Sequence, residues 1–197
     1  MKEKLFLAAF DLFMKYGIKS VSMDDICRKL GVSKKTLYTV IESKKDLIEK
    51  IIKLHLIRDQ EDINNLIENS DTAIEEMTKI GRHVVIFLRE MKPSLIYDLQ
   101  KYYPEAWDMI EEQHYGFIYK VIHANLLRGQ KEGLYIDSFD PVIIAKLYVE
   151  KTHSIADEDQ FPSIKFPRSD LFEEMLRYHM RGIVSDKGKK LLKKLEI

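Results

Sequence analysis

The segment SVSMDDICRKLGVSKKTLY, residues 20–38, is predicted to contain two short helices and the turn between them. In its first half, Ser22 is followed three residues later by the carboxylate of Asp25. This spacing resembles a capping box, in which each side chain binds a backbone N–H of the other residue. It predicts a helix over 22–30. Gly31 ends that helix, because glycine adopts the left-handed backbone conformation at little cost.

The second half of the segment repeats this pattern. Ser33 stands three residues before Thr36 and is the predicted N-cap of a helix over 34–41. The first turn of this helix carries Lys34 and Lys35. Two short helices joined by a glycine turn are typical of a helix-turn-helix, in which the start of the second helix reaches base edges. A helical hairpin with surface lysines has the same pattern, so the spacing alone leaves a purely structural interpretation open.

Amphipathic helices flank this segment on both sides. Before it, apolar residues recur at helical spacing between Leu5 and Phe13, which predicts a helix over 2–16. After it, Ser43 is a third N-cap and begins a long helix over 44–67. Three helix starts this close together indicate compact helices with tight connections.

The remainder of the chain keeps the helical periodicity. Further helices are expected over 71–91, 94–103, 104–131, 140–157 and 169–184. The sequence contains no alternating strand of convincing length, no repeat and no low-complexity tract. It therefore predicts an all-α fold of about nine helices, followed by a Lys-rich tail.

The composition excludes several classes of protein. Of the 197 residues, 45% are hydrophobic and 32% are charged, which is ordinary for a globular protein and too apolar for a disordered one. The single cysteine, Cys27, excludes a disulfide framework and is typical of a reducing compartment. The longest apolar run, residues 5–10, is too short for a signal-peptide core or a membrane span. We therefore expect a cytoplasmic protein with no membrane segment.

The net charge of zero hides an uneven distribution of charge. Residues 1–50 carry 11 Lys and Arg against 7 Asp and Glu, whereas residues 51–184 carry 16 against 23. A basic N-terminal segment joined to an acidic body indicates that one end of the chain faces a polyanion. Chance unevenness on a helix-rich surface gives the same imbalance, so the charge supports this interpretation without deciding it.

Several motifs in the N-terminal part resemble a known family. They are AFDLF at 9–13, YG at 16–17, SVSMDDI at 20–26, LGVSKKTLY at 30–38 and SKKDL at 43–47. In this order and spacing they look like the DNA-binding domain of the TetR/AcrR transcriptional regulators, over about residues 3–52. The resemblance implies a helix-turn-helix DNA-binding domain at 1–50 and a helical ligand-binding and dimerisation domain at 51–197. One departure is Thr-Val-Ile at 39–41, where the family often has aromatic residues.

The resemblance also implies which residues contact double-stranded DNA. Those facing the major groove are Ser33, Lys34, Lys35 and Thr36, and those on phosphates are Tyr38 and Lys44, with Ser22 and Arg28 as further phosphate contacts. Lysine contacts contribute mainly sequence-independent affinity, so binding should fall steeply with salt. Arg28 is the only arginine in residues 1–50, so the operator cannot be recognised by several Arg–guanine pairs.

The last two long helices carry dense apolar sets. They are the predicted interface of a homodimer, formed by Ile144, Leu147, Tyr148, Leu171, Phe172, Met175 and Leu176. Pairing these helices with their copies would form a four-helix interface. A dimer is expected because one short recognition helix binds DNA weakly by itself. The alternative is that these side chains fill the core of a single chain.

Aromatic and polar-tipped residues gather in the middle helices. They are the predicted lining of a pocket for a small organic ligand, namely Phe87, Met91, Tyr97, Trp107, Tyr115, Tyr119, His123 and Tyr148. An apolar wall with a few polar tips suits such a ligand. Aromatic residues at helical spacing are more often part of the core, so that alternative stays open for each of them.

Two Glu-x-x-His motifs, Glu111 with His114 and Glu150 with His153, place a carboxylate and an imidazole one helical turn apart. Two such motifs and two further glutamates form the di-iron carboxylate bundle, but no helix between these motifs supplies a bridging glutamate. We therefore expect no metal and no cofactor. The residues and the resemblance together predict a ligand-responsive DNA-binding regulator, a repressor released from a near-palindromic operator by a small molecule, and not an enzyme. The alternative is a helical-bundle metal-dependent enzyme or small-molecule carrier with a vestigial DNA-binding head.

Overall fold

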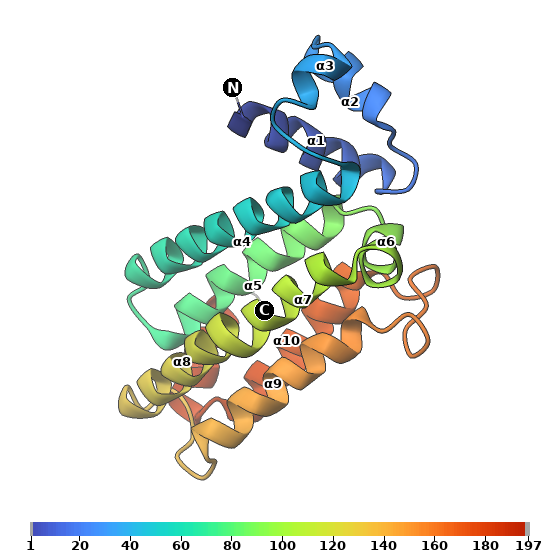
Figure 1. Ribbon diagram of the computed structural model, residues 1–197. Coiled ribbons are helices and arrows are strands. Elements are labelled where there is room, and N and C mark those ends of the chain that lie inside the picture. Colours follow the sequence, from blue (N-terminus) through green and yellow to red (C-terminus); the bar gives the residue numbers. More distant parts are fainter. Residues whose placement is uncertain (1, 196–197) are drawn as a thin grey trace. The chain divides into compact units, whose positions relative to one another are not determined.

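Figure 1 shows the computed structural model of the chain, in which residues 2–195 are described. Its helices are α1 (Lys2–Tyr16), α2 (Met23–Leu30), α3 (Lys34–Leu37), α4 (Lys44–Glu68), α5 (Ala73–Glu90), α6 (Ser94–Tyr102), α7 (Pro104–Gln113), the π-helical segment η1 (His114–Ile118), α8 (Tyr119–Lys131), α9 (Pro141–Ala156), α10 (Arg168–Ile183) and α11 (Asp186–Lys194). Extended pairing within residues 2–195 is limited to an isolated bridge between Tyr135 and Val184. The prediction of an all-α fold is confirmed.

Two details differ from the sequence prediction. The helix expected over 104–131 is interrupted by η1, where the Tyr119 N–H binds the His114 carbonyl in an i→i+5 bond. The apolar spacing continues through this turn, so the periodicity gave no sign of it. The Lys-rich tail forms a helix of its own, α11, because Ser185 caps it by accepting the Gly188 N–H at 3.1 Å.

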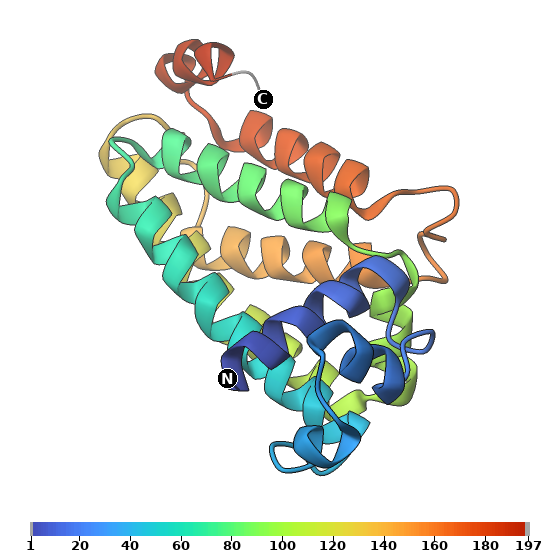
Figure 2. The same cartoon turned by 90° about the horizontal axis from the view of Figure 1, so that it is seen from above.

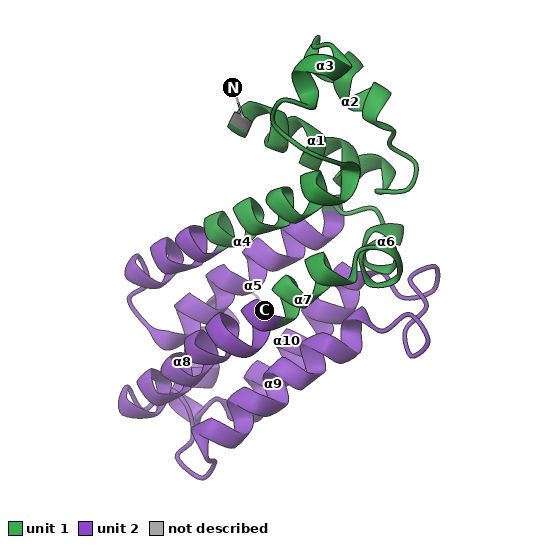
Figure 3. Ribbon diagram, in the orientation of Figure 1, with its two compact units in different colours: residues 1–59, 90–111 green, residues 60–89, 112–197 purple. Residues whose placement is uncertain are grey.

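The chain divides into two compact units, coloured separately in Figure 3. Unit 1 comprises Met1–Asp59 and Glu90–Glu111, and unit 2 comprises Gln60–Arg89 and Glu112–Ile197. Both α4 and α7 contribute residues to both units. The compact units are divided after residues 59, 89 and 111. The functional domain boundary predicted at residue 50 stays a prediction.

In unit 1, α1, α2 and α3 form a small helical head. Its core takes four side chains from α1, among them Ala9 and Phe13, two from α2, one of which is Ile26, and Leu37 from α3. Ile26 and Leu37 are fully buried. The first turn of α4 adds Leu47, which is also fully buried. A head with so few core residues depends strongly on the geometry of the turns that join its helices.

The helix α6 belongs to unit 1 although it follows α5 in the chain. The Lys92 N–H, just before α6, binds the Met14 carbonyl at 2.7 Å. The buried carboxylate of Asp98 accepts the Lys19 N–H at 3.1 Å. Between these contacts Gly17 has a φ of 82°, and a Cβ there would lie 2.9 Å from the Ser94 Oγ. The turn after α1 is therefore attached to α6 by hydrogen bonds and by close packing.

In unit 2, one apolar core joins α5, α8, α9 and α10. Ile74, Leu126, Ala145 and Met180 are almost fully buried in this core, one on each helix. Figure 2 shows α5 running beside α10. The two helices approach closely where Gly81 faces the Leu176 side chain, since a Cβ on this glycine would lie 2.1 Å from the leucine Cδ2.

A buried polar network closes one end of unit 2. Glu76 has a 4% exposed side chain and pairs with the Arg128 guanidinium at 2.8 Å. Its other oxygen accepts the Asn125 amide at 2.9 Å, and the Tyr135 hydroxyl donates to the Asn125 Oδ1 at 2.9 Å. Burial raises the pKa of Tyr135 well above its ordinary value, so the phenol stays a donor. Each polar group in this network has a partner, as a buried network requires.

Candidate nucleic-acid interface

Hydrogen bonds define both ends of α2. At its N-terminus, the Ser22 Oγ accepts the Asp25 N–H at 3.2 Å and the Asp25 Oδ2 accepts the Ser22 N–H at 2.9 Å. The hydroxyl and the N–H of Ser22 together hold the pKa of Asp25 below its ordinary value. At the C-terminus, Gly31 has a φ of 64° and its N–H binds the Arg28 carbonyl. The predicted capping box and glycine turn are confirmed.

The second helix of the motif is shorter than predicted. The Ser33 Oγ caps α3 by accepting the Thr36 N–H at 3.1 Å. The α-helix then ends at Leu37, and the N–H groups of Thr39 and Val40 bind carbonyls three residues before them. The Thr39 hydroxyl donates to the Thr36 carbonyl at 2.6 Å and so competes for the acceptor that a longer helix would use.

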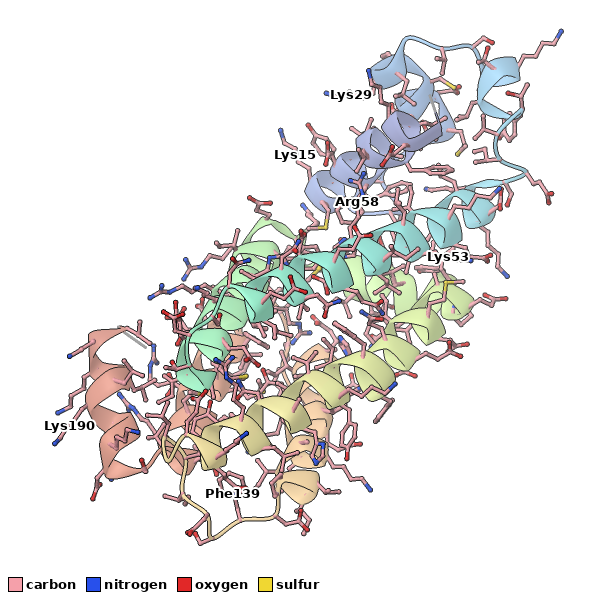
Figure 4. All side chains as sticks on the ribbon, turned by 90° about the vertical axis from the view of Figure 1, so that its left-hand side faces the viewer. Lys15, Lys29, Lys53, Arg58, Phe139 and Lys190 are labelled. Atoms are coloured by element: carbon pink, nitrogen blue, oxygen red, sulfur yellow. The ribbon has the colours of Figure 1, made fainter. Side chains whose placement is uncertain are left out.

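The outward face of the motif is polar and basic. Five of the residues predicted to contact DNA lie at or near the second helix, and all five are exposed, namely Ser33, Lys34, Lys35, Thr36 and Tyr38. Leu37, which lies among them in the sequence, is buried. The Arg28 side chain on α2 is 80% exposed, with a 3.5 Å contact to Asp25. Its neighbour Lys29, labelled in Figure 4, is also exposed. These donors are therefore accessible to a DNA duplex.

Two of the predicted contact residues already have partners in the head. The Lys34 ammonium forms an ion pair with Asp24 at 2.8 Å, with both side chains more than half exposed. The Lys44 ammonium points inward and donates to the Ile18 and Val21 carbonyls at 2.5 and 2.6 Å. Burial lowers the pKa of Lys44. The turn before α2 leaves two carbonyls that need a donor, and the Lys44 ammonium supplies it. The structure thus places this ammonium against the turn before α2 rather than on the outer surface.

This arrangement of helices coincides with a match to a described family. Residues 5–51 match the family described as bacterial regulatory proteins, tetR family. Residues 5–51 therefore form a helix-turn-helix domain of the tetR family. The matched region contains α1 from its second turn onward, α2, α3 and the first two turns of α4, and this part of the sequence carries the caps and the glycine turn.

Similar proteins extend the comparison beyond this domain to more than nine-tenths of the chain. It is 23% identical over 192 residues to an uncharacterised HTH-type transcriptional regulator, YvaF of Bacillus subtilis (strain 168), covering 94% of this chain and 97% of that protein. The structure of reduced NemR from E. coli aligns with a TM-score of 0.73 at 12% identity, over 93% of this chain and 96% of that one. A transcriptional regulator from Saccharomonospora viridis in complex with choline aligns with a TM-score of 0.69 at 16% identity, over 93% and 97%. At these identities the structural likeness shows the fold.

The residues predicted to line a ligand pocket fall in both units. In unit 1, Met91 is buried, Tyr97 is 41% exposed, and Trp107 donates to the Glu111 carboxylate at 2.9 Å. In unit 2, Tyr119 stacks on His123 with ring centroids 5.8 Å apart. Three more of these predicted pocket residues lie in unit 2. Phe87 is half-buried, and Tyr115 is exposed and stacks on His153. Tyr148 is buried and packs against His179. Their role in ligand binding stays a prediction.

Two hollows lie elsewhere in the described residues. One, of about 540 Å³ in unit 2, has walls from α11 and the segments before α5 and after α8, including Lys187, Lys190 and Glu132. Lys190 is labelled in Figure 4. The other, of about 190 Å³ in the head, has apolar walls that include Leu30 and Val40. Neither is lined by a residue predicted for the pocket.

The residues predicted for a dimer interface separate into inward and outward sets. Tyr148, Phe172, Met175 and Leu176 are buried in the core of unit 2. Ile144 and Leu171 are half-buried, and Leu147 is 50% exposed. The most exposed apolar residues beside Leu147 are Ile143, which belongs to the dense apolar set of its helix, and Tyr178, which the sequence prediction missed. Ile143 lies one helical turn before Leu147, whereas Tyr178 lies outside the apolar spacing of Met175 and Leu176.

We call Ile143, Leu147 and Tyr178 the α9–α10 face. The Lys151 ammonium lies 4.3 Å from the centre of the Tyr178 ring, so the outward sides of α9 and α10 are adjacent. Ile143 and Leu147 lie one turn apart on α9 and are 56% and 50% exposed. Apolar side chains exposed together on neighbouring helices are typical of a protein interface.

Two structural findings bear on the alternative functions. The His114 and His153 rings lie 5.5 Å apart, and the Tyr115 hydroxyl donates to Glu150 at 3.2 Å. Yet residues 2–195 contain no group of three or more His, Cys, Asp or Glu side chains arranged to hold a metal ion. In the same part of the chain, no helix has both the length and the apolar composition that a bilayer crossing requires.

Proposed function

We propose that this chain is a cytoplasmic, homodimeric transcriptional repressor, not an enzyme, that binds a near-palindromic operator and is released by a small organic ligand. The observation that carries the proposal is the capped helix-turn-helix, whose second helix exposes Lys34, Lys35 and Tyr38 around one buried anchor. In such a motif the start of the second helix enters the major groove, while lysines and hydroxyls bind phosphates.

The α9–α10 face supports the homodimer. On α9, Leu147 lies between Ile143 and Lys151, whose ammonium lies over the Tyr178 ring. A centrally placed apolar side chain is the kind whose loss most weakens a protein interface. A two-fold dimer presents two recognition helices to two half-sites of the operator. Each half-site contact then adds to the other, which offsets the weak binding of a single short helix.

The helix α4 supports coupling between the ligand and DNA. It begins at Lys44, whose ammonium braces the turn before α2, and it continues to Glu68 in unit 2. A ligand that binds unit 2 can therefore act on the head through one continuous helix. To clear the operator, it must favour the released conformation by a few kcal/mol, or roughly 5 kcal/mol for a nearly complete shift.

Fluorescence anisotropy on DNA that flanks the chain's own gene tests the proposal. We expect tight binding of two chains per site, at least 100-fold weaker binding to scrambled DNA of the same length, and weaker binding at higher salt. Lys34→Ala and Tyr38→Phe should both weaken binding. Equal, weak binding to both duplexes, together with no sequence enriched from a random library, would contradict DNA recognition. A tightly bound small molecule that leaves operator affinity unchanged would contradict the release mechanism.

A further inference from the structure

An acidic side chain lies on the DNA-facing surface of the head. The Asp24 carboxylate, on the first turn of α2, lies 2.8 Å from the ammonium of Lys34, the first residue of α3. The two side chains are 58% and 59% exposed, so this ion pair joins the two helices at the surface and not in the core. An exposed pair of this kind contributes little to folding stability.

A carboxylate in this place opposes non-specific DNA binding. Phosphates are anionic, so Asp24 repels them, and it also cancels the charge by which Lys34 would attract them. Lys35 is exposed beside this pair and forms no ion pair among residues 2–195. The first turn of α3 therefore carries one lysine suited to phosphates, Lys35, and one whose charge is already balanced, Lys34.

The pair also orients Lys34 before DNA arrives. A lysine side chain has four rotatable carbons, and fixing it costs conformational entropy. The hydrogen bond to Asp24 places the ammonium between α2 and α3 and raises the pKa of Lys34. An oriented donor contributes more binding free energy at a base edge, whose acceptors have fixed positions, than at a phosphate, which accepts hydrogen bonds from many directions.

We propose that Asp24 is a specificity-determining residue, which orients Lys34 toward base edges and disfavours phosphate contact. This inference rests on the proposed DNA-binding function. The pair offers one cationic donor and one anionic acceptor side by side. In the major groove a guanine presents the O6 and N7 acceptors and a cytosine presents the N4 amino donor. The geometry therefore matches G·C base pairs at the positions that face the start of α3.

Asp24→Asn and Asp11→Asn form a matched pair of variants to test this. Each removes one negative charge from an exposed position of the head, but Asp11, on α1, forms no ion pair among residues 2–195. The probes are the duplex that the unaltered chain enriches from a random-sequence library and a scrambled duplex of the same composition. Affinity for each is measured at several salt concentrations.

We expect Asp24→Asn to bind the scrambled duplex about threefold more tightly and to lower the ratio of specific to scrambled affinity about tenfold. Its salt dependence should become steeper by about one phosphate contact, since Lys34 is freed. Asp11→Asn should leave the ratio unchanged. Asp24→Glu, which keeps the carboxylate, should restore most of the ratio. On a Lys34→Ala background, Asp24→Asn should change this ratio much less, because only the direct repulsion of phosphates and the loss of the carboxylate acceptor remain.

A ratio that is the same in Asp24→Asn and Asp11→Asn would overturn this inference while leaving the proposed function intact. A loss of specificity as large on the Lys34→Ala background as in the unaltered chain would also overturn it, since Asp24 would then not act through Lys34. If the unaltered chain enriches no sequence at all, the proposed function fails and this inference fails with it. Thermal unfolding of both variants separates these outcomes from misfolding, because an exposed pair should shift the Tm by only a few degrees.

Discussion

In the proposed function the head and the α9–α10 pair each present a surface to a macromolecule, but the two regions are built in opposite ways. In the head, α2 has eight residues and α3 has four, and both depend on serine caps and on the Gly31 turn. In the body, α9 and α10 have sixteen residues each and depend on the apolar core of unit 2. The head exposes charged side chains around the buried Leu37, whereas α9 and α10 expose apolar side chains beside the core of unit 2.

The difference indicates where each region is vulnerable. A short capped helix loses its position when the backbone conformation of a turn is altered, because little burial holds it in place. A long helix in a continuous core tolerates changes of backbone propensity but not an unpaired charge or a lost contact partner. Substitutions in the two regions should therefore differ in kind as well as in size.

The largest effect is expected from Leu147→Asp on the α9–α10 face. A two-fold axis would place the new carboxylate in the interface twice, so we expect dimer association to weaken about 1,000-fold. The fold of the chain should persist, because this side chain is 50% exposed in the chain itself. Sedimentation equilibrium measures the dissociation constant. Ile57→Asp on α4, at a residue that is 47% exposed, is the matched control and should leave it unchanged. Equal effects of the two variants would contradict this interface.

The second effect tests the buried network of unit 2. Glu76→Gln removes the charge that balances Arg128, and we expect a loss of about 3 kcal/mol in the free energy of unfolding. Its neighbour Glu75 forms a partly exposed pair with Lys79, so Glu75→Gln should cost at most about 0.5 kcal/mol. Urea unfolding of both variants gives the comparison. A similar small loss in both would show that the network does not depend on its charge.

The sequence predicted the head well because its determinants are local. Ser22 and Asp25 are three residues apart, and the hydrogen bonds between them need no other part of the chain. The same holds for Ser33 and for the turn at Gly31. The inward direction of Lys44 was not predictable in this way, because its acceptors are carbonyls of Ile18 and Val21, which the fold brings near.

The body was predictable in class but not in detail. Apolar residues of α9 and α10 repeat at helical spacing on more than one side of each helix, so the pattern could not separate Leu147, which faces outward, from Leu176, which faces the core. The assignment of α6 to unit 1 rests on Asp98 and Lys92, whose partners lie far away in the sequence. Such contacts follow from tertiary packing, and no local sequence pattern predicts them.

A third prediction concerns His179 on α10. Burial lowers the pKa of this imidazole from 6.5 to about 4, with Lys151 acting in the same direction, and its ring packs against Tyr148. Between about pH 4 and pH 6.5, the unfolded chain therefore binds more protons at this imidazole than the folded chain does. Stability is therefore full above about pH 6.5 and falls as the pH decreases, by up to about 3 kcal/mol near pH 4. His179→Gln should lack this part of the pH dependence in urea unfolding. Identical slopes in both proteins would exclude His179 as its source.

The smallest effect compares a glycine of the head with one of the body. Gly31 and Gly182 both have open space around the position of a Cβ, but only Gly31 has a left-handed φ, 64°. Gly31→Ala should therefore lower the free energy of unfolding by about 1–2 kcal/mol. Gly182→Ala, within α10, should raise it by about 0.5 kcal/mol, since alanine is the better helix former. Because packing is the same at both sites, opposite signs in urea unfolding isolate the backbone conformation as the cause. Changes of the same sign would mean that the Gly31 turn does not hold the head together.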